Sequence, residues 1–338
     1  MADSSNETHP THLSPSELGT KEYWESFYTR TLTHISSKQH PSSTTNDPET
    51  HADEDNDDDQ EDYNVDSDPG TSWFSEHNAP QKVLDFLTGE LFPLAPCNTL
   101  PAGSRRRTTK RKLTAEEKAA QPSVLDLGTG NGSMLALLRK RGGFKGELVG
   151  VDYSGMSVQL ARELQESRGH EAYQSDSDDE SEFEDEEGGD EAGNADGEEE
   201  WDPIVFEEYD ILGSEEELAA GKVSWFPYKK GGFDIVLDKG TFDAVSLMTE
   251  KKECERYPGI AGALVRKGGF LVVTSCNWTE EEVVRWFTEA EVRSVDAAAS
   301  ASASASGKLV VWGKVQYPRF KFGGQEGQGV CTVCFQRV

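Results

Sequence analysis

The stretch that most constrains the fold is a short apolar run that ends in three closely spaced glycines. Residues 124–132 read VLDLGTGNG, a pattern that predicts a buried strand, a glycine turn and then a helix over 133–141. Glycine lacks a Cβ and tolerates positive φ, so such a turn lets the backbone approach a ligand closely. The helix after the turn offers free N–H groups and a partial positive charge. The stretch therefore predicts a site for a nucleotide-type cofactor.

The spacing of the glycines bears on which cofactor binds. The dinucleotide fingerprint is G-x-G-x-x-G, with an acidic residue about 20 positions further on. Here Gly128, Gly130 and Gly132 are spaced G-x-G-x-G, and Asp126 stands two residues before the first. The pattern D-x-G-x-G-x-G is typical of class I S-adenosylmethionine-dependent methyltransferases. It disfavours a nicotinamide-dependent oxidoreductase, while a plain tight turn without a ligand stays open at this point.

The alternation of apolar runs and helical patterns extends this reading to the whole fold. Strands are expected at 147–151, 204–208, 233–237 and 270–274, and a terminal pair at 308–315 and 330–336. The segment between the last two is glycine-rich rather than helical, which favours a hairpin over a parallel crossover. The sequence thus predicts an α/β fold. Its Rossmann-like seven-stranded methyltransferase sheet is mostly parallel, with an antiparallel C-terminal hairpin strand and helices on both faces. Two capping-box patterns, at 214–217 and 279–282, predict helix starts.

The net charge of −30 comes from two segments rather than from the whole chain. Residues 47–68 hold twelve acidic residues, residues 171–202 hold seventeen, and neither segment contains Lys or Arg. Such segments cannot bury enough apolar surface to fold. We therefore expect a disordered N-terminus over 1–18, an N-terminal helix of the catalytic domain over 19–36, an acidic disordered linker over 37–70, and a methyltransferase domain over 71–338 with disordered insertions at about 93–121, 171–202 and 296–307.

The cysteines and the basic residues bear on location. Five cysteines are scattered along the chain, no signal peptide is recognised, and no apolar run approaches the roughly 18 residues of a membrane span. We expect a cytoplasmic protein with no membrane contact. The basic loop at 105–112 suggests possible nuclear access, against the simpler reading of a solvated loop. The histidines form no ligand spacing, and Cys331 and Cys334 would point to opposite faces of a strand, so no metal site is expected.

Acidic residues stand at four strand ends around the glycine loop. Ligands of open α/β sheets bind outside the carboxyl ends of the strands. We expect Asp152 to accept the ribose hydroxyls and Asp210 to accept the adenine amino group, with Ile211 against the ring. Asp126 would orient the methionine ammonium, and Asp238 would face the reacting end. The cofactor-binding residues predicted from the sequence are Asp126, Gly128, Thr129, Gly130, Asn131, Gly132, Asp152, Tyr153, Asp210, Ile211 and Asp238.

Several stretches together resemble a known family. They are LGTKEYW at 18–24, the glycine loop, FDIVLDKGTFDA at 233–244, SCNWT at 275–279 and YPRFKFGG at 317–324. In these stretches the chain resembles the seven-strand S-adenosylmethionine-dependent protein-lysine methyltransferases that act on translation elongation factor 1-alpha. The resemblance implies S-adenosylmethionine as cofactor, elongation factor 1-alpha as protein partner, and methyl transfer to a lysine ε-amine by in-line displacement. Positioning supplies much of the rate in such a reaction.

The attacking lysine must be neutral, against a solution pKa of about 10.4, and a dry aromatic channel would lower that pKa by desolvation. The candidates for this channel are Tyr23, Trp24, Trp73, Phe74 and Trp278. Asp238 and Asn277 are expected to hydrogen-bond the incoming amine; the alternative is that both only brace loops. Two further functions stay open: a small-molecule methyltransferase of the same fold, or a non-catalytic binder of basic proteins through the acidic segments. We expect a monomer that does not bind nucleic acid directly.

Overall fold

The computed structural model describes residues 12–39, 74, 77–101, 113–168, 171–173, 202–290, 292–293, 306–318, 320–322, 325–327 and 329–338. Trp73, the basic loop at 105–112, the first acidic segment and all but the ends of the second lie outside these ranges. Among the described helices, none is long and apolar enough to cross a membrane.

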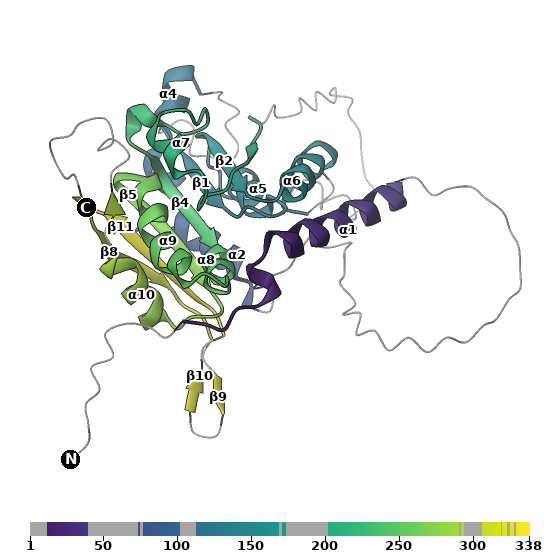
Figure 1. Ribbon diagram of the computed structural model, residues 1–338. Helices are drawn as coiled ribbons and strands as arrows, with labels where there is room; N and C mark the ends of the chain where they lie inside the picture. The colour runs from purple at the N-terminus through teal and green to yellow at the C-terminus, as the bar shows by residue number, and fades with distance from the viewer. Residues whose placement is uncertain are drawn as a thin grey trace, which may run out of the picture.

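A seven-stranded sheet forms the centre of the molecule (Figure 1). Its strands are β1 (Val124–Leu127), β2 (Leu148–Asp152), β3 (Val205–Glu208), β4 (Phe233–Lys239), β5 (Val265–Ser275), β8 (Leu309–Val315) and β11 (Cys331–Arg337), in the order β3-β2-β1-β4-β5-β11-β8. The first five pair in parallel. Strand β11 lies between β5 and β8 and runs antiparallel to both. The predicted fold class, including the antiparallel strand of the terminal hairpin, is confirmed.

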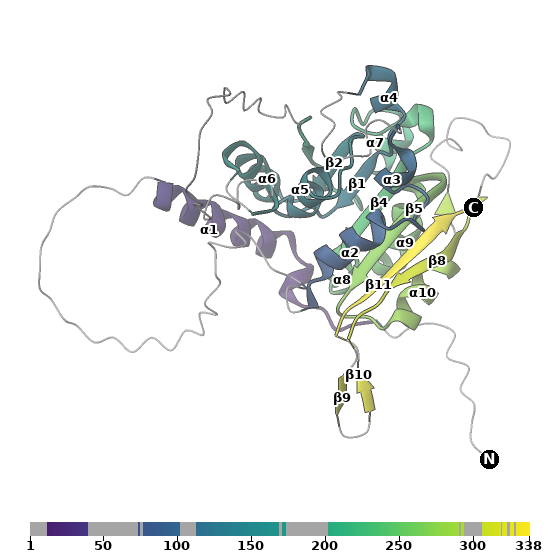
Figure 2. The same cartoon turned by 180° about the vertical axis from the view of Figure 1, so that it is seen from behind.

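Helices cover both faces of this sheet (Figures 1 and 2). They are α1 (Lys21–Gln39), α2 (Ala79–Thr88), α3 (Pro96–Thr99), α4 (Ala115–Ala119), α5 (Ser133–Lys140), α6 (Gly155–Ser167), α7 (Glu215–Ala219), α8 (Thr241–Ser246), α9 (Lys251–Leu264) and α10 (Glu280–Glu289), with short 3-10 turns η1 (Glu17–Gly19), η4 (Glu171–Tyr173) and η5 (Tyr228–Lys230). One apolar core packs α7 to α10 on one face, and a second packs α1, α2, α5 and α6 on the other.

The central strands are buried because both faces are covered. All residues of β1 and β2 are buried, and so are the first six of β4. This matches the near-continuous apolar runs expected of a parallel sheet between two helical layers. Alternate residues of a strand serve the two cores: Val236 packs with α8 to α10, whereas Ile235 and Leu237 pack with α2, α5 and α6. The pairing register of β1 with β2 and with β4 places the carboxyl ends of these three strands along one edge of the sheet.

The connection between β8 and β11 carries a small hairpin of its own. Strands β9 (Phe320–Phe322) and β10 (Gln325–Gly327) pair antiparallel. Figures 1 and 2 agree that this hairpin stands away from the large sheet. A second two-stranded pair, β6 (Val292–Arg293) and β7 (Ser306–Gly307), bridges the start and end of the Ala/Ser-rich insertion. The sequence predicted the terminal hairpin of β8 and β11 but neither of these two smaller pairs.

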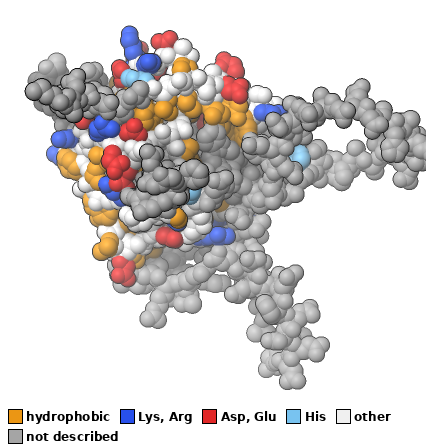
Figure 3. Space-filling view, turned by 90° about the horizontal axis from the view of Figure 1, so that it is seen from below, with side chains coloured by type: hydrophobic (Ala, Val, Ile, Leu, Met, Phe, Trp, Pro, Cys, Tyr) orange, Lys and Arg blue, Asp and Glu red, His pale blue; other side chains and the backbone are white. Residues whose placement is uncertain are grey.

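Both ends of the insertion expected at about 93–121 contain a short helix. Residues 93–101 and 113–121 are described and contain α3 and α4. Helix α4 begins with a capping box in which Thr114 and Glu117 exchange hydrogen bonds. The composition-based reading missed it because it rested on the Pro and basic residues in the rest of the segment. The core, in turn, carries no strong charge bias: acidic and basic side chains are interspersed on its surface seen from below (Figure 3).

Candidate functional site

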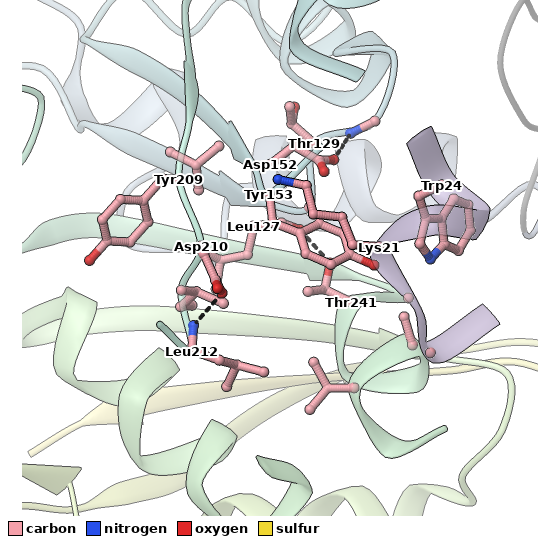
Figure 4. Close-up of a pocket in the computed structure, with 18 of the residues that line it drawn as sticks. Lys21, Trp24, Leu127, Thr129, Asp152, Tyr153, Tyr209, Asp210, Leu212 and Thr241 are labelled. Atoms are coloured by element: carbon pink, nitrogen blue, oxygen red, sulfur yellow. Dashed lines mark hydrogen bonds between the residues drawn. The ribbon is translucent and has the colours of Figure 1, made fainter. Parts of the chain in front are cut away.

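A cavity of about 540 Å³ opens at the carboxyl ends of β1, β2 and β4 (Figure 4). This is the edge at which open α/β sheets bind ligands. Its wall comes from the glycine loop, the turns after β2, β3 and β4, helix α8 and the first half of α1. The wall residues are Gly19, Lys21, Trp24, Tyr28, Leu127, Gly128, Thr129, Gly130, Asn131, Val151, Asp152, Tyr153, Tyr209, Asp210, Ile211, Leu212, Gly213, Lys239, Gly240, Thr241, Ala244, Val245, Met248, Glu250 and Glu253.

The glycine loop needs its glycines for packing as well as for backbone conformation. Gly128, Gly130 and Gly132 all have positive φ, from 56° to 75°. A Cβ on Gly128 would come within 2.2 Å of the Thr241 hydroxyl, which donates to the Leu127 carbonyl. A Cβ on Gly130 would meet the Tyr28 hydroxyl at 3.0 Å. The predicted turn is therefore present, and helix α1 and the turn after β4 close tightly around it.

Asp152 ends β2 with a firmly held carboxylate. One oxygen accepts hydrogen bonds from the Gly130 amide at 3.1 Å and the Ser157 hydroxyl at 2.8 Å, and the other accepts from the Ser154 amide at 2.9 Å. Burial raises the pKa of this carboxyl, and the three donors oppose that shift. Asp152 contributes to the cavity wall. A fixed acceptor at this strand end suits ligand hydroxyl groups.

The turns after β2 and β3 bring the other predicted adenosine contacts to the wall. Asp210 is exposed, and one of its oxygens accepts a hydrogen bond from the Leu212 amide at 3.0 Å. Ile211 comes next to it in the wall, and Asp210 lies between Tyr209 and Leu212 in Figure 4. The Tyr153 hydroxyl donates to the Thr20 carbonyl at 3.1 Å, which ties this turn to α1. An acidic acceptor beside an apolar patch is suited to an adenine ring.

Asp126 and Gly132 lie behind the wall rather than in it. Asp126 is buried, and its carboxylate accepts a hydrogen bond from the Thr129 hydroxyl at 2.9 Å. Burial raises the pKa of Asp126 to about 6, while the positive charge of Lys239 lowers it. Gly132 packs against Phe206, whose ring would lie 2.5 Å from a Cβ at this position. Both residues shape the loop from behind, and Thr129 and Asn131 present its front to the cavity.

Asp238 and Asn277, expected to hold the substrate amine, are placed elsewhere. Asp238 is buried; its carboxylate accepts from the Tyr257 hydroxyl at 2.8 Å and from the amides of Thr241 and Phe242, which begin α8. Burial raises its pKa to about 7. The alternation of β4 directs Asp238 toward α9, and its hydrogen bonds brace the turn. Asn277 is exposed and is also absent from the cavity wall.

Of the aromatic residues expected to line a substrate channel, Trp24 alone among those described lies in the wall. Tyr23 packs edge-on against Trp24 with ring centroids 5.2 Å apart. Phe74 is buried against Gly240, and the buried Trp278 stacks on Phe242 at 5.9 Å. Trp73 falls outside the described residues. These rings serve mainly as core around the site.

Sequence reasoning missed part of the wall that α1 and the turn after β4 supply. Tyr28 lies one helical turn beyond Trp24, so the helical spacing already placed both on one face. Lys21 belongs to the LGTKEYW stretch, and Lys239, Gly240 and Thr241 belong to DKGTFDA. The stretches were recognised, but which side chains face the cavity was not. Glu250, Glu253 and Met248 carried no signal of their own.

A hydrogen-bond network joins two of the recognised stretches. The buried Asp243 of α8 accepts from the Ser275 hydroxyl at 2.5 Å and from the Cys276 amide at 2.9 Å. The Ser275 hydroxyl in turn accepts from the Trp278 amide at 3.1 Å. The last aspartate of DKGTFD thus holds the SCNW turn after β5. This explains why these residue types occur together although more than 30 positions separate them.

The wall fits S-adenosylmethionine in size and chemistry. The glycine loop leaves its backbone open to a ligand, Asp152 and Asp210 offer acceptors at the ends of β2 and β3, and Ile211 and Leu212 add an apolar patch. Lysines and carboxylates both reach the wall, as a zwitterionic ligand requires. The described residues contain no group of His, Cys, Asp and Glu that could hold a metal ion.

Comparisons with known proteins agree with this assignment. Residues 118–188 match the model of a methyltransferase domain. The chain is 29% identical to "Protein-lysine N-methyltransferase EFM4" of Saccharomyces cerevisiae over 328 residues, covering 96% of each chain. It is 25% identical to "EEF1A lysine methyltransferase 2" of Danio rerio, covering 98% of this chain and 93% of the relative, and 24% identical to the protein of that name in Homo sapiens, covering 96% and 88%. Its fold, its glycine loop and this similarity identify the chain as an S-adenosylmethionine-dependent methyltransferase that resembles protein-lysine methyltransferases over nearly its whole length.

Proposed function

We propose that this chain is a protein-lysine N-methyltransferase whose substrate is a lysine of translation elongation factor 1-alpha. The observation that carries the proposal is similarity over nearly the full length of relatives whose names state this activity. The similarity extends beyond the cofactor domain at 118–188, so it includes α1 and the strands after β4. Similarity of this extent favours a protein substrate over a small molecule.

The residues of the wall divide the work of binding and orienting. When bound, S-adenosylmethionine supplies an electrophilic methyl group on its sulfonium. Asp152 and Asp210 would hold the adenosine end, and the loop from Gly128 to Asn131 would hold the opposite end. Trp24 and Tyr28 of α1 close the cavity over the loop and exclude water. Water exclusion keeps the substrate lysine neutral, because desolvation disfavours its charged form.

The experiment is methyl transfer from labelled S-adenosylmethionine to purified elongation factor 1-alpha, followed by mass spectrometry of its lysines. We expect label on lysine with the full chain, and about tenfold less label with the Asp210→Asn variant when the cofactor concentration is below its dissociation constant. The same assay with a metabolite extract tests the small-molecule alternative. A chain that binds S-adenosylhomocysteine but labels no lysine of the elongation factor would refute the proposed substrate.

We also propose that the enzyme works as a cytoplasmic monomer and binds no nucleic acid directly. The near-neutral core supports this, since its surface mixes acidic and basic side chains (Figure 3). Light scattering of the purified chain tests the oligomeric state, and imaging of the tagged chain with and without residues 105–112 tests its location. A stable dimer, or nuclear accumulation that depends on the basic loop, would contradict this part of the proposal.

A further inference from the structure

Two lysines reach the cavity wall, and their surroundings differ. The ammonium of Lys21 lies 3.2 Å from the Glu208 carboxylate and 3.9 Å from that of Glu25. Lys239 has no carboxylate within ion-pair distance among the residues that the structure describes, and its ammonium lies 5.7 Å from the centre of the Phe74 ring. A ring face attracts a cation without forming an ion pair with it. Lys239 is therefore the wall lysine available to an anionic ligand group.

The position of Lys239 identifies which end of the cavity it serves. It is the last residue of β4, one step beyond the pairing of Asp238 with Leu127, the residue before Gly128. Strand alternation puts Lys239 on the face opposite Asp238 and on the same face as Leu237, which pairs with Asp126. Its charge counteracts the effect of burial on the Asp126 pKa. Lys239 thus stands beside the glycine loop, away from Asp210 and the turn after β3.

The charges of the wall make a free cation necessary here. Four carboxylates belong to the wall, those of Asp152, Asp210, Glu250 and Glu253. S-adenosylmethionine brings a further carboxylate on its amino-acid end, and an unpaired carboxylate in a partly closed cavity is costly. We propose that Lys239 is the counter-ion of this α-carboxylate, so that it selects cofactors with a complete amino-acid end. The inference rests on the cofactor and not on the proposed protein substrate.

Two ligands separate this role from general support of the site. S-adenosylhomocysteine carries the amino-acid carboxylate, and 5′-methylthioadenosine keeps the adenosine without it. Isothermal titration of the full chain should show Lys239→Met weakening S-adenosylhomocysteine by roughly ten- to hundredfold, the range of a hydrogen bond to a charged group. The affinity for 5′-methylthioadenosine should change less than about twofold. Lys239→Arg should restore most of the lost affinity, because it restores the charge.

Lys21→Met is the matched control, since it removes the other wall lysine. It should change the affinities for the two ligands by the same factor, because Lys21 is already paired with Glu208 and Glu25. Equal weakening of both ligands by Lys239→Met, or no weakening of either, would overturn the proposal. Should that variant not fold, two other measurements test the same point. One is the affinity of Lys239→Gln for the two ligands. The other is the preference of the wild-type chain for S-adenosylhomocysteine over its decarboxylated analogue. A wild-type chain that binds both analogues equally would reject the counter-ion.

Discussion

Asp152 and Asp210 share a predicted role at the level of single residues but differ in how the fold holds them. Asp152 is buried with three hydrogen-bond donors, whereas Asp210 is exposed. We expect Asp152→Ala to lower both the melting temperature and the affinity for 5′-methylthioadenosine, since it leaves buried donors unsatisfied. Asp210→Asn should weaken that ligand about tenfold with the melting temperature unchanged. Thermal unfolding and titration calorimetry on both variants check this pair; an Asp210→Asn chain with full affinity would contradict it.

Asp238 leads to a prediction about pH. Its pKa rises from 3.8 to about 7 on folding because burial disfavours the charged form. The folded state therefore binds more protons than the unfolded state between these values, so this carboxyl makes stability fall as pH rises from about 4 to 7. Asn keeps an acceptor for the amides of Thr241 and Phe242 but cannot ionise. The change in melting temperature caused by Asp238→Asn should thus be more favourable at pH 8 than at pH 5.

Thermal unfolding of both chains across this pH range provides the measurement. Asp126, Asp152 and Asp243 also have pKa values raised by burial, and they are present in both chains, so the difference between the chains reports Asp238 together with its interaction with Asp243. Parallel melting curves for the two chains at all pH values would show that Asp238 does not titrate as described.

At the scale of elements, helix α1 acts as one wall of the cofactor cavity. The Glu25 carboxylate accepts from the Gly155 amide at 3.0 Å, and the Thr20 carbonyl accepts from the Tyr153 hydroxyl. These contacts, with Trp24 and Tyr28, fix α1 across the glycine loop. Figure 1 shows the helix extending from the edge of the sheet past α6. Helix α1 is therefore part of the site as well as of the apolar core.

Tyr28→Ala tests this second role of α1. The buried ring lies over Gly130, and its removal opens the wall to water. We expect the affinity for S-adenosylhomocysteine to fall about tenfold, with a loss of stability of about 3 kcal/mol typical of aromatic truncation. Tyr28→Phe keeps the ring and should bind within a few-fold of wild type. Thr29→Ala, on the exposed side of the same helix, serves as the control for helix stability. Unchanged affinity in Tyr28→Ala would mean that α1 does not enclose the cofactor.

In the molecule as a whole, local sequence patterns determine some structural features and leave others undetermined. The sheet, its hairpin and the glycine loop could be predicted because each depends on a contiguous run of residues. The orientation of a strand-end carboxylate could not: Asp152 joins the wall, while Asp238, at the end of a nearby parallel strand, is captured by the amides that begin α8. The two capping-box patterns also differ. Thr279 forms its box with Glu282, whereas the Ser214 side chain makes no cap bond because its backbone is not extended.

Contacts between distant segments explain the rest. Tyr28 reaches Gly130 from about 100 positions away, and Asp243 meets the SCNW turn across the end of the sheet. No periodicity or residue spacing in either segment predicts these contacts. Family resemblance marked the same stretches, but it did not say which side chain of each stretch faces the cofactor.

Replacing the second acidic segment tests whether its negative charge is needed for folding and cofactor binding. Of this segment the structure describes residues 171–173 and 202, which are absent from the cavity wall, and Tyr173 packs against Gly132. We expect that replacing 175–200 with a neutral Gly/Ser segment of equal length leaves the melting temperature within a few degrees and S-adenosylhomocysteine affinity within about twofold, because loop-closure entropy depends on length and not on charge. Methyl transfer to elongation factor 1-alpha should continue. Two results together would contradict this expectation. The wild-type chain would transfer no methyl groups, and the variant would keep its cofactor affinity but no longer associate with basic proteins. The protein would then be a non-catalytic binder that acts through its acidic segment.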